Sequence, residues 1–200
     1  MRRRLLVALL SGFILCASAA PAEAKFFEIW GSGLVGGGWG KGNGATDFYR
    51  WASGGAGGFE VGAKILFISA FVDYLRWFGG EEGANLITFN LGGDYALELG
   101  KTFAIVFRLA FGYYHGTLPT DATIMLDNVE VNQVNTRGIG VHGGLGPRIT
   151  FLKFFSVGVT PEIGYHYFFG GAGKPITSTD QNSSGFDLNV LAYFRVGFGI

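Results

Sequence analysis

Residues 86–99 alternate strictly in chemical character. Thr88, Asn90, Asp94 and Glu98 occupy one parity, and the opposite parity carries mainly Ile, Phe, Leu and Tyr side chains. Because successive side chains of a β-strand point to opposite faces, this stretch predicts a strand with one apolar and one polar face. The same two-faced pattern recurs along the chain, which predicts an antiparallel all-β fold.

Eight such segments can be placed along the chain. They are expected near 26–39, 56–65, 67–77, 86–98, 102–115, 136–149, 154–168 and 186–199. Short links near Leu66, Gly100 and Leu152 alternate with long ones over 41–55, 78–85, 116–135 and 170–185. This alternation is typical of a barrel with one short-turn end and one long-loop end. The predicted fold is all-β: an eight-stranded, antiparallel, up-and-down transmembrane β-barrel whose apolar side chains face lipid.

Residues 1–24 have the features of an export signal. Arg2 to Arg4 precede the apolar stretch 5–17, which is too short to span a bilayer as a helix, and Ala22-Glu23-Ala24 is a small-x-small cleavage site. The barrel domain is therefore expected over 25–200, in a Gram-negative outer membrane. Cys16 leaves a lipoprotein as an alternative, although Leu15 stands where a small residue precedes an acylated cysteine.

Composition excludes several kinds of site. Cys16 is the only cysteine, so the mature chain is expected to have no disulfide and no thiol chemistry. The histidines, at 115, 142 and 166, lack the spacing of metal ligands, and no metal or cofactor is expected. The 15 basic and 15 acidic residues balance, which argues against a nucleic-acid partner.

The two faces can be assigned strand by strand. In 102–113 and 156–166 the odd positions are expected to meet lipid, and in 187–198 the even ones. A lipid-facing Arg or Lys at the membrane midplane costs roughly 2–4 kcal/mol, and no charge falls there on these strands. In the third strand we expect Asp73 to point inward and Arg76 to reach the headgroups.

Ionisable side chains at the inward positions are expected to form a self-neutralising ion-pair network that fills the lumen. They are Glu28, Glu60, Lys64, Asp73, Asp94, Glu98, Arg108, His142, Arg148, Glu162, His166, Asp187 and Arg195. A narrow ion path through the same groups is the alternative. Closure between the first and last strands is expected to bring Glu28 toward Arg195.

Turn positions predict two further neighbours within this set. A turn centred near residue 101 places Asp94 opposite Arg108. A turn centred near residue 152 places His142 beside Glu162.

Aromatic residues gather where the strands end, as an interfacial belt would. The outer belt is expected to comprise Trp39, Trp51, Trp77, Tyr113 and Tyr167. A soluble barrel of lipocalin type also has eight alternating strands, but it would bury its apolar parity. The export signal, the aromatic strand ends and a charged face rich in glycine favour the membrane.

The third long link has a strand pattern of its own. Residues 122–126 and 129–134 flank Asp127-Asn128, a pair that tolerates the positive φ of a tight turn. An extracellular β-hairpin extension is therefore expected.

The sequence departs from three known enzyme patterns. Gly31 to Gly36 match the dinucleotide fingerprint formally, but the glycine-rich residues that follow cannot readily form the helix that the motif needs. Lipid A deacylases of the outer membrane carry His-x-Ser, whereas this chain has His115-Gly116-Thr117 without an evident acidic partner. Palmitoyltransferases begin with an amphipathic helix, for which Lys25 leaves no room. We therefore expect no enzymatic activity.

Strand number, loop asymmetry and the terminal strand 186–200 together resemble the small OmpA/OmpX-type outer-membrane β-barrels. Our first hypothesis for the role of this chain is a monomer in contact with outer-membrane lipid, with a structural or loop-mediated binding role; a narrow pore and a lipid A-modifying enzyme are the alternatives. The resemblance implies that the last strand is recognised by the barrel-assembly machinery, and such strands usually end in an aromatic residue. This chain instead ends Phe198-Gly199-Ile200.

Overall fold

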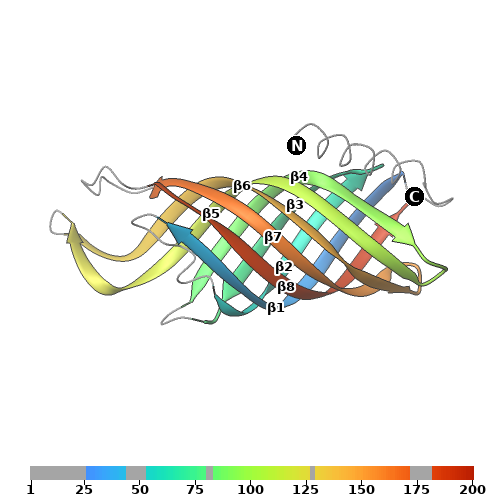
Figure 1. Cartoon of the computed structure of the whole chain (residues 1–200), viewed down its shortest axis with the longest axis horizontal. Coiled ribbons are helices and arrows are strands. Elements are labelled where there is room, and N and C mark those ends of the chain that lie inside the picture. The colour runs from blue at the N-terminus through green and yellow to red at the C-terminus, as the bar shows by residue number, and fades with distance from the viewer. Residues whose placement is uncertain (1–25, 44–52, 80–82, 127–128, 172–181) are drawn as a thin grey trace, which may run out of the picture.

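The computed structural model contains one closed antiparallel barrel in which every strand pairs with its neighbours in sequence and β8 closes on β1 (Figure 1). The structure describes residues 26–43, 53–79, 83–126, 129–171 and 182–200. Its strands are β1 (Phe27–Asn43), β2 (Gly54–Ile65), β3 (Ile68–Trp77), β4 (Ala84–Glu98), β5 (Phe103–Leu126), β6 (Val129–Phe151), β7 (Phe155–Gly171) and β8 (Asn182–Gly199). The predicted fold class is confirmed. The expected leader, 1–24, lies outside the described residues.

The two ends of the barrel differ as the sequence predicts. The tight β2–β3, β4–β5 and β6–β7 links lie at one end, together with Phe27 and Ile200, whose backbones exchange two hydrogen bonds of 3.0 Å. At the other end β5 and β6 continue past their neighbours as a paired ribbon, visible on the left of Figure 1. This ribbon confirms the predicted hairpin extension; its turn, Asp127-Asn128, lies outside the described residues.

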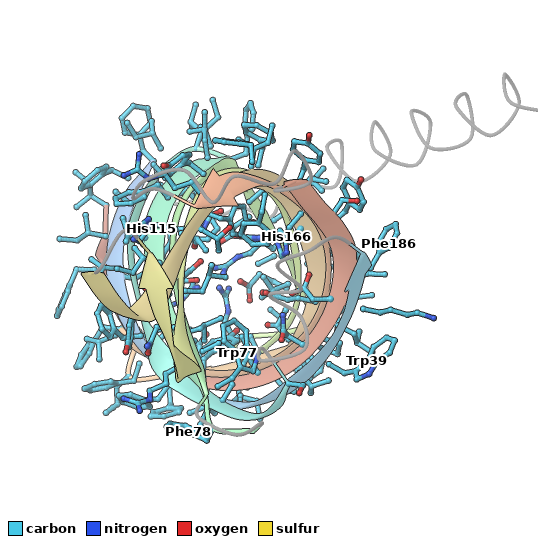
Figure 2. The ribbon with its side chains drawn as sticks, turned by 90° about the vertical axis from the view of Figure 1, so that its left-hand side faces the viewer. Trp39, Trp77, Phe78, His115, His166 and Phe186 are labelled. Carbon is cyan, nitrogen blue, oxygen red and sulfur yellow. The ribbon has the colours of Figure 1, made fainter. Side chains whose placement is uncertain are left out.

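Side chains alternate between outward-facing and lumen-facing positions along the strands wherever their side chains are described. On β5, Leu109 and Phe111 are 59% and 57% exposed, whereas the intervening Ala110 is 2% exposed. In the end-on view of Figure 2, Trp39 and Phe186 point away from the barrel axis, while Trp77 and His166 point into it. The predicted orientation, with the apolar face outside, is confirmed. In the ranges that the structure describes, no helix is long and apolar enough to span a membrane.

Glycines allow the strands to approach where no side chain would fit. A Cβ on Gly146 of β6 would lie 1.8 Å from the carbonyl oxygen of Val159 on β7, and one on Gly36 of β1 would lie 2.0 Å from that of Val190 on β8. Neither carbonyl can move without breaking its strand. The high glycine content therefore supports a narrow, tightly curved barrel.

Candidate functional site

Arg108 on β5 lies at the centre of a charged network inside the barrel. Its Nε donates to Asp94 Oδ1 at 2.8 Å and its Nη2 to Asp94 Oδ2 at 3.1 Å, which makes a bidentate pair. Its Nη1 also donates to Glu60 Oε2. Asp94 lies directly opposite Arg108 in the β4–β5 register, where a turn centred near residue 101 places it. Bidentate charge-assisted pairs of this kind are the stronger class of hydrogen bond.

Glu60 on β2 is shared between two guanidinium groups. Besides Arg108, it accepts a 2.9 Å hydrogen bond from Nη2 of Arg195 on β8, and the Trp30 indole N–H donates to the same Oε1. Arg195 also donates from Nε to the Ser32 hydroxyl at 3.2 Å. Glu60 is only 2% exposed, so it needs these donors to offset the loss of water. One carboxylate thereby connects four strands across the lumen.

Aromatic rings cover the two guanidinium groups. The Arg108 carbon Cζ lies 4.6 Å from the centroid of the Phe71 ring, and that of Arg195 lies 4.9 Å from the Trp30 ring and 5.4 Å from the Tyr193 ring. These distances suit cation–π attraction. The sequence interpretation did not single out Trp30 or Phe71. Strand alternation could have found both. Trp30 and Phe71 each lie two residues from an inward-facing carboxylate on the same strand, so they point to the same side.

Asp73 points inward on β3, as predicted, and is held by its neighbours on β4. Its Oδ2 accepts hydrogen bonds from Thr88 Oγ1 at 2.9 Å and from Asn90 Nδ2 at 2.8 Å. The Asn90 amide donates to the Thr88 hydroxyl as well. These three side chains form a polar cluster beside the central network.

Two simpler ion pairs lie toward the short-turn end. Lys64 Nζ is 3.2 Å from Glu28 Oε2, and Arg148 Nη2 is 3.2 Å from Glu98 Oε1. The side chains of the first pair are 18% and 12% exposed, and Glu98 is 39% exposed. Each pair neutralises itself, and the second is partly hydrated.

The expectation that Glu28 meets Arg195 is wrong. The β1–β8 register places Glu28 opposite Gly199 and Ser32 opposite Arg195. Arg195 therefore lies farther from the short-turn end and contacts Ser32, while Glu28 contacts Lys64 on β2. The offset between first and last strands is a property of the closed barrel, which the local pattern does not encode.

The two lumen histidines contact tyrosine and aspartate. Tyr114 Oη and His142 Nδ1 share a hydrogen bond of 2.8 Å, and His166 Nδ1 is 3.4 Å from Asp187 Oδ1. The rings of Tyr114 and His166 lie 4.3 Å apart, so these groups form one cluster. It lies on the long-loop side of the Arg108 network.

The expectation that His142 lies beside Glu162 is also wrong. The β6–β7 register pairs His142 with Gly164 and Glu162 with Gly144, two residues away from the predicted alignment. The cause is the turn, whose centre falls at Lys153 because Phe151 pairs with Phe155.

A small cavity lies beside the Arg108 network. It has a volume of about 40 Å³ and is lined by charged and polar groups that include Glu60, Asp73, Arg108, Glu162 and Arg195. A buried water needs roughly 10–15 Å³, so the cavity has room for about three or four waters. Glu162 lines this cavity.

Apolar side chains fill the lumen on the long-loop side of this cavity. The cluster, here called the lumen plug, comprises Ala56, Leu75, Trp77, Ala84, Leu86, Tyr114, Phe168 and Leu191. Trp77 is 2% exposed and points into the barrel in Figure 2, so its assignment to the outer aromatic belt is wrong. Its indole is accommodated because Ala56 and Ala84, its partners on β2 and β4, are small.

Three of the other residues expected in the outer aromatic belt do face outward. Trp39, Tyr113 and Tyr167 face outward near the long-loop end, with exposed fractions of 60%, 38% and 39%. Trp51 lies outside the described residues. At the short-turn end Phe154 contacts Phe155 and Phe198, with ring centroids 4.5 and 5.9 Å apart.

Two of the partial enzyme motifs lie within strands of the barrel. Gly31–Gly36 lie within β1, which continues as a strand to Asn43. His115 occupies an outward-facing position. Every strand carboxylate whose side chain is described occupies an inward-facing position instead. Within the described ranges, no group of three or more His, Cys, Asp or Glu side chains could hold a metal ion.

Comparisons with known proteins return solved barrels. No protein-family model and no curated protein sequence matches the chain. Neisserial surface protein A is 14% identical, with a TM-score of 0.49 over 88% of this chain and 99% of that one. The N-terminal β-barrel domain of Pseudomonas aeruginosa OprF is 11% identical, with a TM-score of 0.44 over 83% and 96%. The attachment invasion locus protein Ail of Yersinia pestis is 10% identical, with a TM-score of 0.37 over 85% and 99%.

Proposed function

We propose that this protein is a non-enzymatic, monomeric barrel of a bacterial outer membrane that contacts its partners through its outer loops. In this proposal residues 1–24 direct export and are removed, and β8 is recognised by the barrel-assembly machinery. The lipid-facing wall supports the location, because apolar and aromatic side chains occupy its outward positions and the strand carboxylates face the lumen.

One observation carries the loop-mediated role. The β5–β6 ribbon extends beyond the barrel, with backbone pairs that continue to Leu126 and Val129. The lumen beneath it is filled by the lumen plug and by the Arg108 network. A barrel that is closed inside and extended outside presents its contact surface at the ribbon and not along its axis.

Surface labelling tests this arrangement. Because Cys16 is the only cysteine and belongs to the expected leader, single cysteines can be introduced into an otherwise thiol-free mature chain. We expect Glu130→Cys, on the ribbon, to react with a membrane-impermeant maleimide on intact cells. The matched variant Lys101→Cys, in the β4–β5 turn, should react only after lysis. The reverse result would contradict the proposed orientation, and labelling of neither site on intact cells, with both labelled after lysis, would contradict the location.

A shortened variant separates a binding role from a purely structural one. Replacing residues 119–133 by Asn-Gly joins Leu118 to Val134, which already face each other in register. Each chain is expressed in cells that lack the protein, and any change in phenotype that the deletion causes is measured. A loop-mediated role predicts that only the full-length chain reverses this change. Equal restoration by the shortened variant would contradict the loop role.

The filled lumen also predicts that the protein does not conduct ions. The cavity of about 40 Å³ ends against the lumen plug, so we expect no continuous aqueous path through the described part of the barrel. In planar bilayers we expect the purified protein to produce no steady single-channel steps. Steps that Arg108→Ala abolishes or alters would instead support the narrow ion path.

A further inference from the structure

Among the Lys, Arg, His, Asp and Glu residues with described side chains, those at outward strand positions are all basic. Among residues with described side chains, the long-loop end carries Lys41, Arg76, His115 and Arg137 on the outward parity. The tight turns at the opposite end carry the exposed Lys101 and Lys153. The strand carboxylates whose side chains are described point inward: Glu28, Glu60, Asp73, Asp94, Glu98, Glu162 and Asp187. No described carboxylate therefore competes for the basic groups outside.

Three of these basic groups form a band across β3 to β6. His115 on β5 pairs directly with Arg137 on β6. Arg76 on β3 lies one outward position higher and is linked to β5 through the register pairs Arg76–Asn85 and Asn85–Thr117. Neighbouring strands lie about 4.8 Å apart, so the band spans roughly 14 Å from β3 to β6. We call Arg76, His115 and Arg137 the outer basic band.

Neighbouring side chains hold the band at the edge of the apolar wall. Arg76 lies over the Phe78 ring, with its Cζ 6.0 Å from the centroid, and the Tyr74 hydroxyl donates to Asn85 Oδ1 at 2.9 Å. The next outward positions toward the barrel middle are apolar or aromatic, and Tyr113 and Ile139 are 38% and 41% exposed. The outer surface therefore changes from apolar to cationic between one outward-facing residue and the next toward the long-loop end.

We infer that the outer basic band binds the phosphate groups of a doubly phosphorylated glycolipid in the surrounding leaflet. Guanidinium groups favour phosphate because their planar donors match its oxygens. The phosphates belong to a lipid because the band lies directly above the wall that faces acyl chains. A width of roughly 14 Å lets one headgroup contact Arg137 with one phosphate and Arg76 with another. This inference rests on the proposed outer-membrane location.

Binding to lipid A with and without its phosphates tests the inference. The full mature chain, folded in detergent micelles, is titrated with bisphosphorylated lipid A, with dephosphorylated lipid A of the same acyl chains, and with inorganic phosphate. We expect tight binding of the bisphosphorylated lipid A alone. The double variant Arg76→Gln/Arg137→Gln should weaken it about thirtyfold, since each basic group near a lipid surface contributes severalfold. The matched control Lys101→Gln/Lys153→Gln removes two charges at the other end and should bind as the parent does.

Each other outcome would overturn the inference. Equal binding of both lipid A forms would show that only acyl chains are recognised, and equal binding of inorganic phosphate would show a free anion site. Arg76→Lys/Arg137→Lys keeps both charges but loses the planar donors, so it should bind more tightly than the glutamine variant and less tightly than the parent, which separates lost recognition from misfolding. The location is tested separately by labelling at Glu130→Cys, so a failure of the proposed function can be distinguished from a failure of this binding site.

Discussion

Replacing Arg108 by methionine is expected to lower the free energy of unfolding by about 3–5 kcal/mol. The substitution removes the guanidinium that pairs bidentately with Asp94 and also donates to Glu60. Glu60 keeps Arg195, but Asp94, 8% exposed, is left as an uncompensated charge. Urea unfolding in lipid vesicles, followed by tryptophan fluorescence, measures the loss.

Arg148→Met is the matched control for this substitution. It removes the same group from an ion pair whose acidic partner, Glu98, is 39% exposed. Partly hydrated pairs contribute about 0–1 kcal/mol, so little change is expected. If the two variants lost equal stability, the central network would hold the barrel no more strongly than a surface pair does.

Leu109→Arg is expected to cost about 2–4 kcal/mol in a bilayer. Leu109 is 59% exposed and lies on the outward face of β5, between Gly93 on β4 and Gly143 on β6. An arginine there would face acyl chains near the middle of the wall. Unfolding in vesicles, compared with the parent chain, gives the difference.

Thr117→Arg provides the depth control on the same strand and face. Thr117 is in register with Asn85, at the level of Arg76, where an added charge reaches the headgroups and costs about 0–1 kcal/mol. An equal, small cost at both positions would mean that the outward face meets water. The soluble-barrel alternative would then be restored.

The alternation of side chains predicted the strands and their order. Together with the export signal, the aromatic strand ends and the glycine-rich charged face, it also predicted that the apolar parity faces outward. It also predicted the Asp94–Arg108 alignment, because the β4–β5 turn is centred where the local pattern places it. These features depend on neighbouring residues of one hairpin, and a single sequence contains that information.

The errors arose where the information is not local. Leu152 and Lys153 both have positive φ, at 57° and 61°, without the glycine or asparagine that signals such a conformation. The β6–β7 register, and with it the partner of His142, could therefore not be read from residue types. The Glu28 assignment failed because the offset between β1 and β8 is determined by closure of all eight strands.

Trp77 illustrates a conflict between two rules. Its position at a strand end suggested the interfacial belt, whereas its parity with Asp73 placed it inside. Parity prevailed because the lumen near Ala56 and Ala84 has space that only a large side chain fills. Strand parity is enforced by backbone geometry, while the aromatic belt is a statistical preference.

The mutual hydrogen bonds between Phe27 and Ile200 have a consequence for aggregation. Because β1 and β8 are hydrogen-bonded to each other, the wall of the barrel has no unpaired strand edge among the described residues, and only the β5–β6 ribbon continues past its neighbouring strands. Before β1 pairs with β8, the sheet has two unpaired edge strands at the same time. The barrel wall is therefore protected against edge-to-edge self-association in a single step, when the sheet closes between β1 and β8.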